Sequence, residues 1–82
     1  RYRRYFMILE KIKDIMEEEL GKDRNEVTLE SDIIKDLGLD SLDIVTLIMA
    51  VEDEYGFTAD DDEIVNLKTV GDVVKYIENA TK

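Results

Sequence analysis

The sequence lacks both cysteine and histidine among its 82 residues. Without cysteine there is no disulfide bond and no thiolate nucleophile, and without histidine there is no Ser-His-Asp triad and no imidazole ligand for a metal. We therefore expect neither a metal centre nor a serine hydrolase. Proline is also absent and glycine occurs only four times. Both facts favour helices joined by a few loops over a turn-rich β fold.

Positive charge is scarce, and the imbalance is uneven along the chain. The 11 Lys and Arg residues face 21 Asp and Glu residues, which gives a formal net charge of −10. Residues 1–30 hold 7 basic and 8 acidic side chains, a net of −1, whereas residues 31–82 hold 4 and 13, a net of −9. A nucleic-acid-binding protein needs a basic surface, so this class is excluded, whereas an acidic surface attracts basic partners. We therefore expect any electrostatic docking face to lie within residues 31–82.

Long hydrophobic runs are missing too. No apolar stretch approaches the roughly 20 residues that a membrane-spanning helix needs. The length allows one small domain over residues 1–82, and the apolar share of 44% is enough for one core. The opening RYRRY is basic and aromatic, unlike the rest of the sequence. We interpret residues 1–4 as a basic tail or as the remnant of a transit peptide or of a cloning vector.

What the sequence does contain is helical periodicity. Apolar residues recur at steps of three and four over residues 5–20, which predicts an amphipathic helix that Gly21 ends. A second helix is predicted over residues 41–55, with Asp40 as its N-cap and Asp43 in a capping-box-like position. This helix is apolar nearly all round, so one of its faces has to meet something other than the first helix, either more core or a partner.

The remaining segments complete an all-α fold. Residues 21–40 form a long connection whose apolar side chains should pin it to the core, with a single helical turn capped by Ser31. Residues 57–68 should form a loop and a short helical segment, and the last helix should start at Thr69 with Asp72 in the capping-box position. The inner face of the short segment is assigned to Ile64, Val65 and Leu67. We predict a small three-to-four-helix bundle with a long first loop.

The most informative stretch is Gly38-Leu39-Asp40-Ser41-Leu42-Asp43. It places Ser41 at the first position of a helix, directly after a loop, where the side chain points outward and the helix N-terminus favours an attached phosphate group. Ser41 is equally well explained as an ordinary N-cap. It is not expected to act as a nucleophile, because the sequence offers no histidine base and the nearest lysine, Lys35, lies among carboxylates in the preceding loop. With no acid–base pair elsewhere, we do not expect an enzyme.

The same stretch resembles the phosphopantetheine attachment motif of acyl carrier proteins. Residues 44–57 are similar to the second helix of that family and residues 68–73 to the start of its last helix, and the resemblance spans residues 6–80. It implies that a phosphopantetheinyl transferase moves 4'-phosphopantetheine from coenzyme A to Ser41. The thiol of this arm would hold acyl chains as thioesters and present them to the enzymes of fatty-acid biosynthesis through basic patches on those enzymes.

The resemblance also implies a sheltered acyl chain and an acidic docking face. The family shelters the chain among its helices, and the candidates for acyl or partner contact, which are equally explained as ordinary core, are Leu42, Val45 and Met49. The candidates for partner docking are Asp40, Asp43, Glu52, Asp53, Asp61 and Asp62. The sequence departs from the family at Thr46, where many members have glutamate, and at Asp60, where a proline often precedes the third helix.

Other functions stay open at this point. A carrier of the same fold can serve polyketide, peptidyl or D-alanyl transfer, and an acidic helical adaptor without the arm could bind basic partners. The intact Ser41 argues against the adaptor. We expect a monomer that works in the cytoplasm, with an organelle matrix or a plastid stroma as the other settings.

Overall fold

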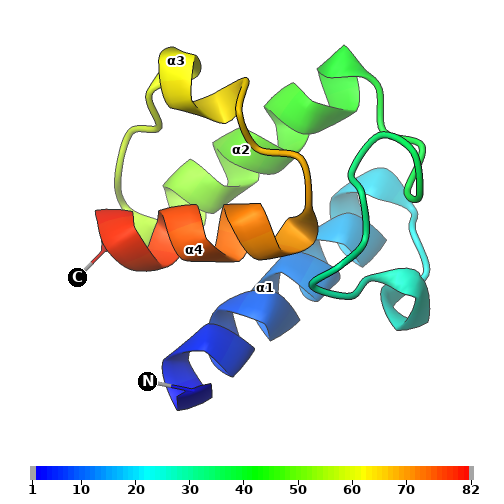
Figure 1. The fold of residues 1–82 in the computed structure, drawn as a ribbon, viewed down its shortest axis with the longest axis horizontal. Helices are drawn as coiled ribbons and strands as arrows, with labels where there is room; N and C mark the ends of the chain where they lie inside the picture. The colour runs from blue at the N-terminus through cyan, green and yellow to red at the C-terminus, as the bar shows by residue number, and fades with distance from the viewer. Residues whose placement is uncertain (1, 82) are drawn as a thin grey trace.

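The periodic apolar segments fold into the predicted helices. The computed structural model describes residues 2–81, and its elements in chain order are α1 (Tyr2–Leu20), the 3-10 helix η1 (Arg24–Glu26), α2 (Ser41–Tyr55), α3 (Asp61–Ile64) and α4 (Val70–Ala80). Helix α1 packs against both α2 and α4, and the short α3 lies on the far side of these two helices from α1 (Figure 1). The predicted small all-α bundle with a long first loop is therefore confirmed.

The core draws on three helices and on the long first loop. Its buried side chains come from α1, α2 and α4, as the three- and four-residue spacing predicted, and each fully buried aliphatic side chain contributes roughly 1.5–3 kcal/mol. Residues 21–40 also supply core side chains, which confirms that this connection is pinned to the bundle. The core residues of the loop are Val27, Ile33, Leu37 and Leu39, each no more than 6% exposed.

Helix α1 begins at Tyr2, earlier than the predicted start at residue 5. Residues 2–4 therefore continue the helix and do not form a separate tail, while Arg1 lies outside the described residues. The guanidinium of Arg4 donates to the carbonyl oxygen of Thr81 at 2.8 Å and also to its hydroxyl. These hydrogen bonds tie the first turn of α1 to the end of α4, so the two ends of the chain lie on the same side of the bundle (Figure 1).

The turn in the first loop is capped by Asp32 and not by Ser31. Asp32 Oδ1 accepts the backbone N–H groups of Ile34 and Lys35 at 2.9 and 2.8 Å. These hydrogen bonds, that from Lys35 first, lower the pKa of the Asp32 carboxyl. Ser31 is instead buried, and its hydroxyl accepts the N–H of Thr28 at 3.0 Å. The predicted cap was wrong by one residue because both residue types cap well and burial decides between them.

The first loop is also joined to the start of α4. The N–H of Ile33 donates to the carbonyl oxygen of Lys68 at 2.8 Å, and the N–H of Gly71 donates to that of Leu29 at 2.8 Å. A Cβ atom at residue 71 would lie 3.0 Å from the Leu29 carbonyl oxygen, so this close approach of two backbones favours glycine. The predicted capping box of Thr69 and Asp72 is present at the same place.

Candidate functional site

Ser41 is presented by a short segment whose backbone is fixed on both sides. Gly38 adopts a φ of +67°, a left-handed conformation that other residues adopt only with strain, and its N–H donates to the Ile34 carbonyl oxygen at 3.0 Å. Leu39 is only 2% exposed and anchors the chain in the core immediately before α2. The buried leucine and the helix start together place Ser41 at the surface, where its side chain is exposed.

The cap of α2 is supplied by Asp40. Asp40 Oδ1 accepts the N–H of Asp43 at 2.8 Å, and Asp43 Oδ2 accepts the N–H of Asp40 at 3.2 Å, which forms the predicted capping box. Ser41 is therefore the first residue of the helix and not its N-cap, so the alternative explanation of this serine as an ordinary cap is wrong. Its hydroxyl lies at the positive end of the helix dipole.

A largely apolar cavity of about 310 Å³ opens beside Ser41. It is open to the surface and lies between the first loop, α2, α3 and the start of α4, with Ser41 as the polar residue of its lining. The other lining side chains are Ile33, Ile34, Ile44, Leu47, Ile48, Ile64, Val65, Leu67 and Val73. A hydrophobic chain attached near Ser41 would find in this cavity a place away from water.

A second hollow of about 330 Å³ lies between α2 and α3. It combines apolar and acidic side chains, because Val45, Met49, Glu52 and Asp61 are all part of its lining. We call it the α2–α3 groove. It shares four lining residues with the cavity beside Ser41, namely Ile44, Ile48, Ile64 and Val65. The two hollows are therefore neighbours with a common wall.

The three residues predicted for acyl or partner contact are exposed and do not belong to the core. The exposed fractions of Leu42, Val45 and Met49 are 73%, 52% and 59%. Val45 and Met49 line the α2–α3 groove, whereas Leu42 lines neither hollow. The cavity beside Ser41 was missed, although Ile44 and Ile48 follow Ser41 by three and seven residues and so share its helix face. Val65, assigned above to an inner face, is 78% exposed.

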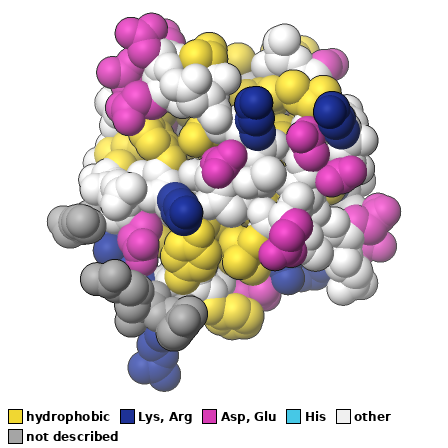
Figure 2. All heavy atoms as spheres, viewed as in Figure 1, with side chains coloured by type: hydrophobic (Ala, Val, Ile, Leu, Met, Phe, Trp, Pro, Cys, Tyr) yellow, Lys and Arg dark blue, Asp and Glu magenta, His cyan; other side chains and the backbone are white. Residues whose placement is uncertain are grey.

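The predicted docking residues fall into two groups. Asp40, Asp53, Asp61 and Asp62 are exposed, and Figure 2 shows acidic side chains gathered over α3. Asp43 and Glu52 are half-buried and hydrogen-bonded within the bundle: Asp43 in the capping box, and Glu52 through Oε2, which accepts the Ala59 N–H at 2.7 Å. Among residues 2–81, no group of three or more acidic side chains is placed to hold a metal ion.

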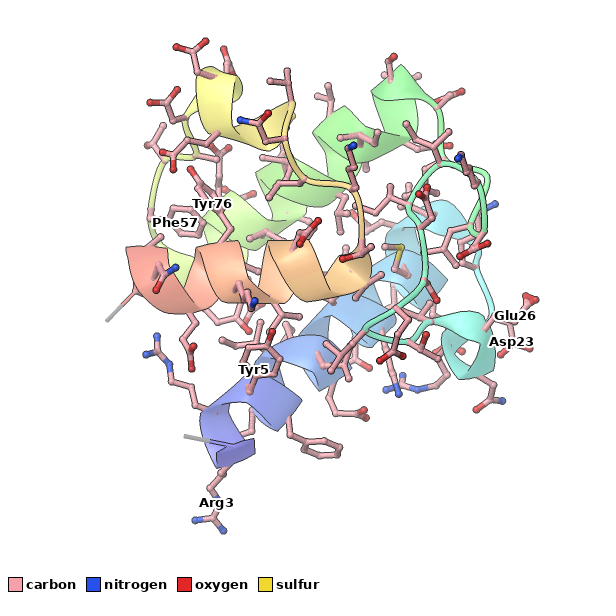
Figure 3. The ribbon with its side chains drawn as sticks, in the orientation of Figure 1. Arg3, Tyr5, Asp23, Glu26, Phe57 and Tyr76 are labelled. Atoms are coloured by element: carbon pink, nitrogen blue, oxygen red, sulfur yellow. The ribbon has the colours of Figure 1, made fainter. Side chains whose placement is uncertain are left out.

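The segment before α3 is held by a residue of α4. The N–H of Asp60 donates to Tyr76 Oη at 2.9 Å, and the rings of Phe57 and Tyr76 lie with their centroids 6.1 Å apart (Figure 3). A proline at residue 60, which the family often has, could not donate this hydrogen bond. The departure at Asp60 thus has a structural consequence that the sequence did not show.

Comparisons with known proteins identify the family of the chain. A family model described as phosphopantetheine attachment site matches residues 10–77. An acyl carrier protein of Clostridium acetobutylicum is 50% identical over 76 residues, which cover 93% of this chain and 99% of that protein. The crystal structure of an acyl carrier protein from Thermotoga maritima matches with a TM-score of 0.86 at 31% identity, covering 94% of this chain and 89% of that chain. The chain therefore belongs to the acyl carrier proteins, the non-catalytic carriers with a phosphopantetheine attachment site.

Proposed function

We propose that Ser41 is the residue that carries the phosphopantetheine arm. The observation that supports this most directly is its position: an exposed hydroxyl at the first residue of α2, with the capping role taken by Asp40. A transferase can reach a side chain placed in this way. The rigid backbone at Gly38 and Leu39 would hold the attachment point in one orientation.

The surroundings of Ser41 suit a covalent attachment better than an ionic one. The N-terminus of α2 favours a phosphodiester on the hydroxyl, but the carboxylates of Asp40 and Asp43 repel a free anion. A covalent bond would hold a phosphate at this position against that repulsion. The bound arm supplies a thiol on a flexible tether, and the protein residues around Ser41 fix the point at which this tether is attached.

The cavity beside Ser41 is our candidate shelter for the acyl chain. Its lining is aliphatic apart from Ser41, and it opens next to the attachment point. Burial of the acyl chain there would be favourable by roughly 0.8 kcal/mol for each methylene group removed from water. We therefore propose Ile44 and Ile48, which lie on the same face of α2 as Ser41, as contacts of the acyl chain in place of Leu42.

We propose that partners dock on an acidic surface that extends from Ser41 along α2 and over α3. Asp40 and Asp53 are exposed at the two ends of α2, and Asp61 and Asp62 are exposed on α3. Opposite charge at this surface would steer basic patches of partner proteins toward the arm, and the affinity should fall steeply with added salt. Affinities that do not change with salt would contradict this docking mode.

The pathway we propose is fatty-acid biosynthesis, with a phosphopantetheinyl transferase as the first partner. None of the described helices is both long enough and apolar enough to cross a bilayer. We propose that residues 1–82 act as one carrier domain, as a monomer in the cytoplasm. Polyketide, peptidyl or D-alanyl transfer would use the same arm, so the acyl group found on the protein separates these uses.

Intact mass spectrometry tests the attachment site. The protein is incubated with coenzyme A and a phosphopantetheinyl transferase, together with Ser41→Ala and the control Thr46→Ala, which removes another hydroxyl of α2. We expect a gain of one phosphopantetheine in the wild-type protein and in Thr46→Ala, and none in Ser41→Ala. No gain with a folded, unmodified wild-type sample and several active transferases would favour an adaptor without the arm.

A further inference from the structure

A third hollow, of about 520 Å³, lies between the first half of α1 and the C-terminal end of α2. This volume falls within the range of roughly 300–1,000 Å³ that is usual for sites of small organic ligands. We call it the basic hollow, because most of its charged side chains are positive. Its lining residues are Arg3, Arg4, Met7, Ile8, Lys11, Glu54 and Tyr55.

The basic hollow is remote from the proposed attachment point. Glu54 follows Ser41 by 13 residues within α2, which corresponds to about 20 Å along the helix axis. The first turns of α1 and the start of α2 lie at opposite ends of the molecule (Figure 1). None of the lining residues of the basic hollow also lines the cavity beside Ser41 or the α2–α3 groove. The proposed arm and its acyl chain therefore leave this hollow unused.

The charge of the basic hollow is opposite to that of the whole chain. Three positive side chains and one negative side chain line it, whereas the chain carries a net charge of −10. Glu54, the negative one, pairs with Lys11 at 3.6 Å. The guanidinium of Arg4 donates to neutral oxygens of Thr81, and Arg3 extends from the first turn of α1 into solution (Figure 3). An anionic group is therefore attracted to this hollow.

The basic hollow also offers apolar surface beside its cations. Met7 is 62% exposed, an unusual amount for a large apolar side chain, and it is adjacent to the buried Ile8. Burial, and after it the charge of Glu54, raises the pKa of the Tyr55 hydroxyl, so this ring stays uncharged. A ligand that covers Met7 and Tyr55 would remove apolar surface from water.

We propose that the basic hollow binds a single-chain amphiphile with an anionic head, namely a long-chain carboxylate. The carboxylate group binds to the positive side chains of Arg3, Arg4 and Lys11. The alkyl chain lies against Met7 and Tyr55. Neither charge nor apolar surface alone defines this ligand, because the lining combines the two.

A small ligand suits this hollow better than an anionic membrane or an acidic protein. Exposed Asp53 precedes Glu54 in the sequence, and Glu10 precedes Lys11. Exposed charges act over about 10 Å at an ionic strength of 0.1 M, so a broad anionic surface would meet these carboxylates as well as the hollow. A single carboxylate group meets chiefly the lining, where positive charge dominates.

The proposed function would supply such a ligand. Attack of water on an acyl thioester gives a long-chain carboxylate and the free thiol of the arm. The basic hollow would bind this product at the end of the molecule remote from Ser41, so the attachment point stays free for another chain. This interpretation rests on the proposed function, whereas the binding of a carboxylate does not and is tested in protein without the arm.

The first test titrates the unmodified protein with decanoate, below the concentration at which decanoate forms micelles. Backbone amide shifts are followed by nuclear magnetic resonance, and we expect saturable shifts at Met7 and Tyr55. The cavity beside Ser41 is apolar too, and decanoate bound there would shift Ile44 and Ile48. Shifts at this second pair alone would overturn the proposal, and so would a titration without any shift.

Phe6 and Met7 provide a matched pair of variants. The two side chains are neighbours on α1 and are 61% and 62% exposed, but Met7 lines the basic hollow and Phe6 does not. Met7→Ala should raise the Kd of decanoate about threefold, because the alkyl chain loses an apolar contact, and Phe6→Ala should leave it unchanged. Equal effects of the two variants would overturn the proposed contact.

The charged residues give effects of opposite sign. Glu54→Gln removes the negative side chain of the hollow and should lower the Kd about twofold, and Arg3→Gln should raise it by a similar factor. Asp53→Asn is the control, since it removes a neighbouring carboxylate that does not line the hollow. Tighter binding in Glu54→Gln excludes loss of the fold as the cause. An equal gain in Asp53→Asn would show that net charge alone matters and would overturn the site.

Two further probes separate the head from the chain. Decanol lacks the charge and butanoate lacks most of the alkyl chain, so each should bind at least about fivefold more weakly than decanoate. Decanol that binds as tightly as decanoate would contradict the role of the basic side chains. The protein should also stay in solution when vesicles of anionic phospholipid are sedimented. Sedimentation that Arg3→Gln abolishes, without shifts by decanoate, would identify a membrane surface as the occupant and overturn the proposal.

Discussion

The bundle has two connections that lack long helices, and they differ in what they bury. The first connection, residues 21–40, has five buried residues, which are Val27, Ser31, Ile33, Leu37 and Leu39. The second connection, residues 56–69, includes α3 and has only Ala59 buried. Length is therefore a poor guide to rigidity. The buried side chains make the first connection part of the scaffold that presents Ser41, whereas the second connection has fewer buried side chains to stabilise it.

The largest expected effect comes from comparing two variants, each of which shortens one side chain in one of the two connections. Leu39→Ala removes a side chain that is 2% exposed and should lower the free energy of unfolding by about 2–5 kcal/mol, because a cavity is left behind. Val65→Ala removes one that is 78% exposed and should change it by less than about 0.5 kcal/mol. Urea unfolding followed by circular dichroism measures both. Similar losses in the two variants would show that the second connection is as firmly packed as the first.

A smaller contrast is expected for two hydroxyl groups. The buried Ser31 hydroxyl accepts the Thr28 N–H at 3.0 Å and donates to the Glu26 carbonyl oxygen at 3.2 Å. Ser31→Ala leaves both groups without this partner and should cost about 1–2 kcal/mol in the free energy of unfolding. Thr58→Ala, in the exposed part of the second connection, should be nearly neutral. If the urea midpoint of Ser31→Ala equals that of the wild type, water replaces the lost hydrogen bonds.

A pH dependence should come from two carboxylates that accept backbone hydrogen bonds, Asp32 in the first connection and Asp72 in the first turn of α4. Hydrogen bonds from the Lys35 and Ile34 N–H groups lower the pKa of Asp32, and those from Lys68 and Thr69 lower the pKa of Asp72. A lowered pKa in the folded state stabilises the protein above the ordinary value near 3.8, and this gain is lost as the pH falls through the folded pKa.

The matched variants for this effect are Asp32→Asn and Asp72→Asn. Each should be less stable than the wild type at pH 6. The difference should begin to shrink as the pH falls below about 4, where the carboxyl of the unfolded wild-type chain becomes protonated, and it should vanish below the lowered pKa of the folded state. Urea midpoints at pH 6, 4 and 3 give the comparison. A difference that stays constant with pH would mean that the charge of these carboxyls does not contribute.

The smallest expected effect concerns the acidic surface of residues 31–82. Asp53 lies near the C-terminal end of α2, where the helix dipole disfavours negative charge and α2 has no basic residue in its last turn. Asp53→Asn should therefore stabilise the fold by less than about 0.5 kcal/mol at low salt, and added salt should diminish this gain. The wild-type melting temperature should itself rise with salt. A melting temperature unmoved by salt would contradict repulsion among these carboxylates.

The features that sequence predicted well are local ones. The bounds of α2 and its capping box of Asp40 and Asp43 depend on residues close together in the chain, and so does the box of Thr69 and Asp72. The choice between Ser31 and Asp32 as a cap was not local, because the fold buries one hydroxyl and leaves the neighbouring carboxylate to cap the turn.

In the candidate site, too, the features that depend on residues close together in the chain could be predicted, and those that depend on packing could not. The attachment motif and its place at a helix start follow from the residues around Ser41, and the structure has the helix start there. The cavity lining joins the first loop, α2, α3 and α4, so no single periodic pattern marks it. The anchoring of Ala59 and Asp60 by side chains of two helices could not be predicted either, because it depends on how those helices pack.

The hydrogen bonds between Arg4 and Thr81 have a practical consequence for handling the protein. They bring the two chain ends together, and the start of α2 lies at the opposite end of the molecule (Figure 1). A bead, a fluorophore or a fused protein attached at either terminus will therefore sit away from Ser41. Molecules immobilised through the N-terminus or the C-terminus will expose the same face to solution, and binding measured in the two formats should agree.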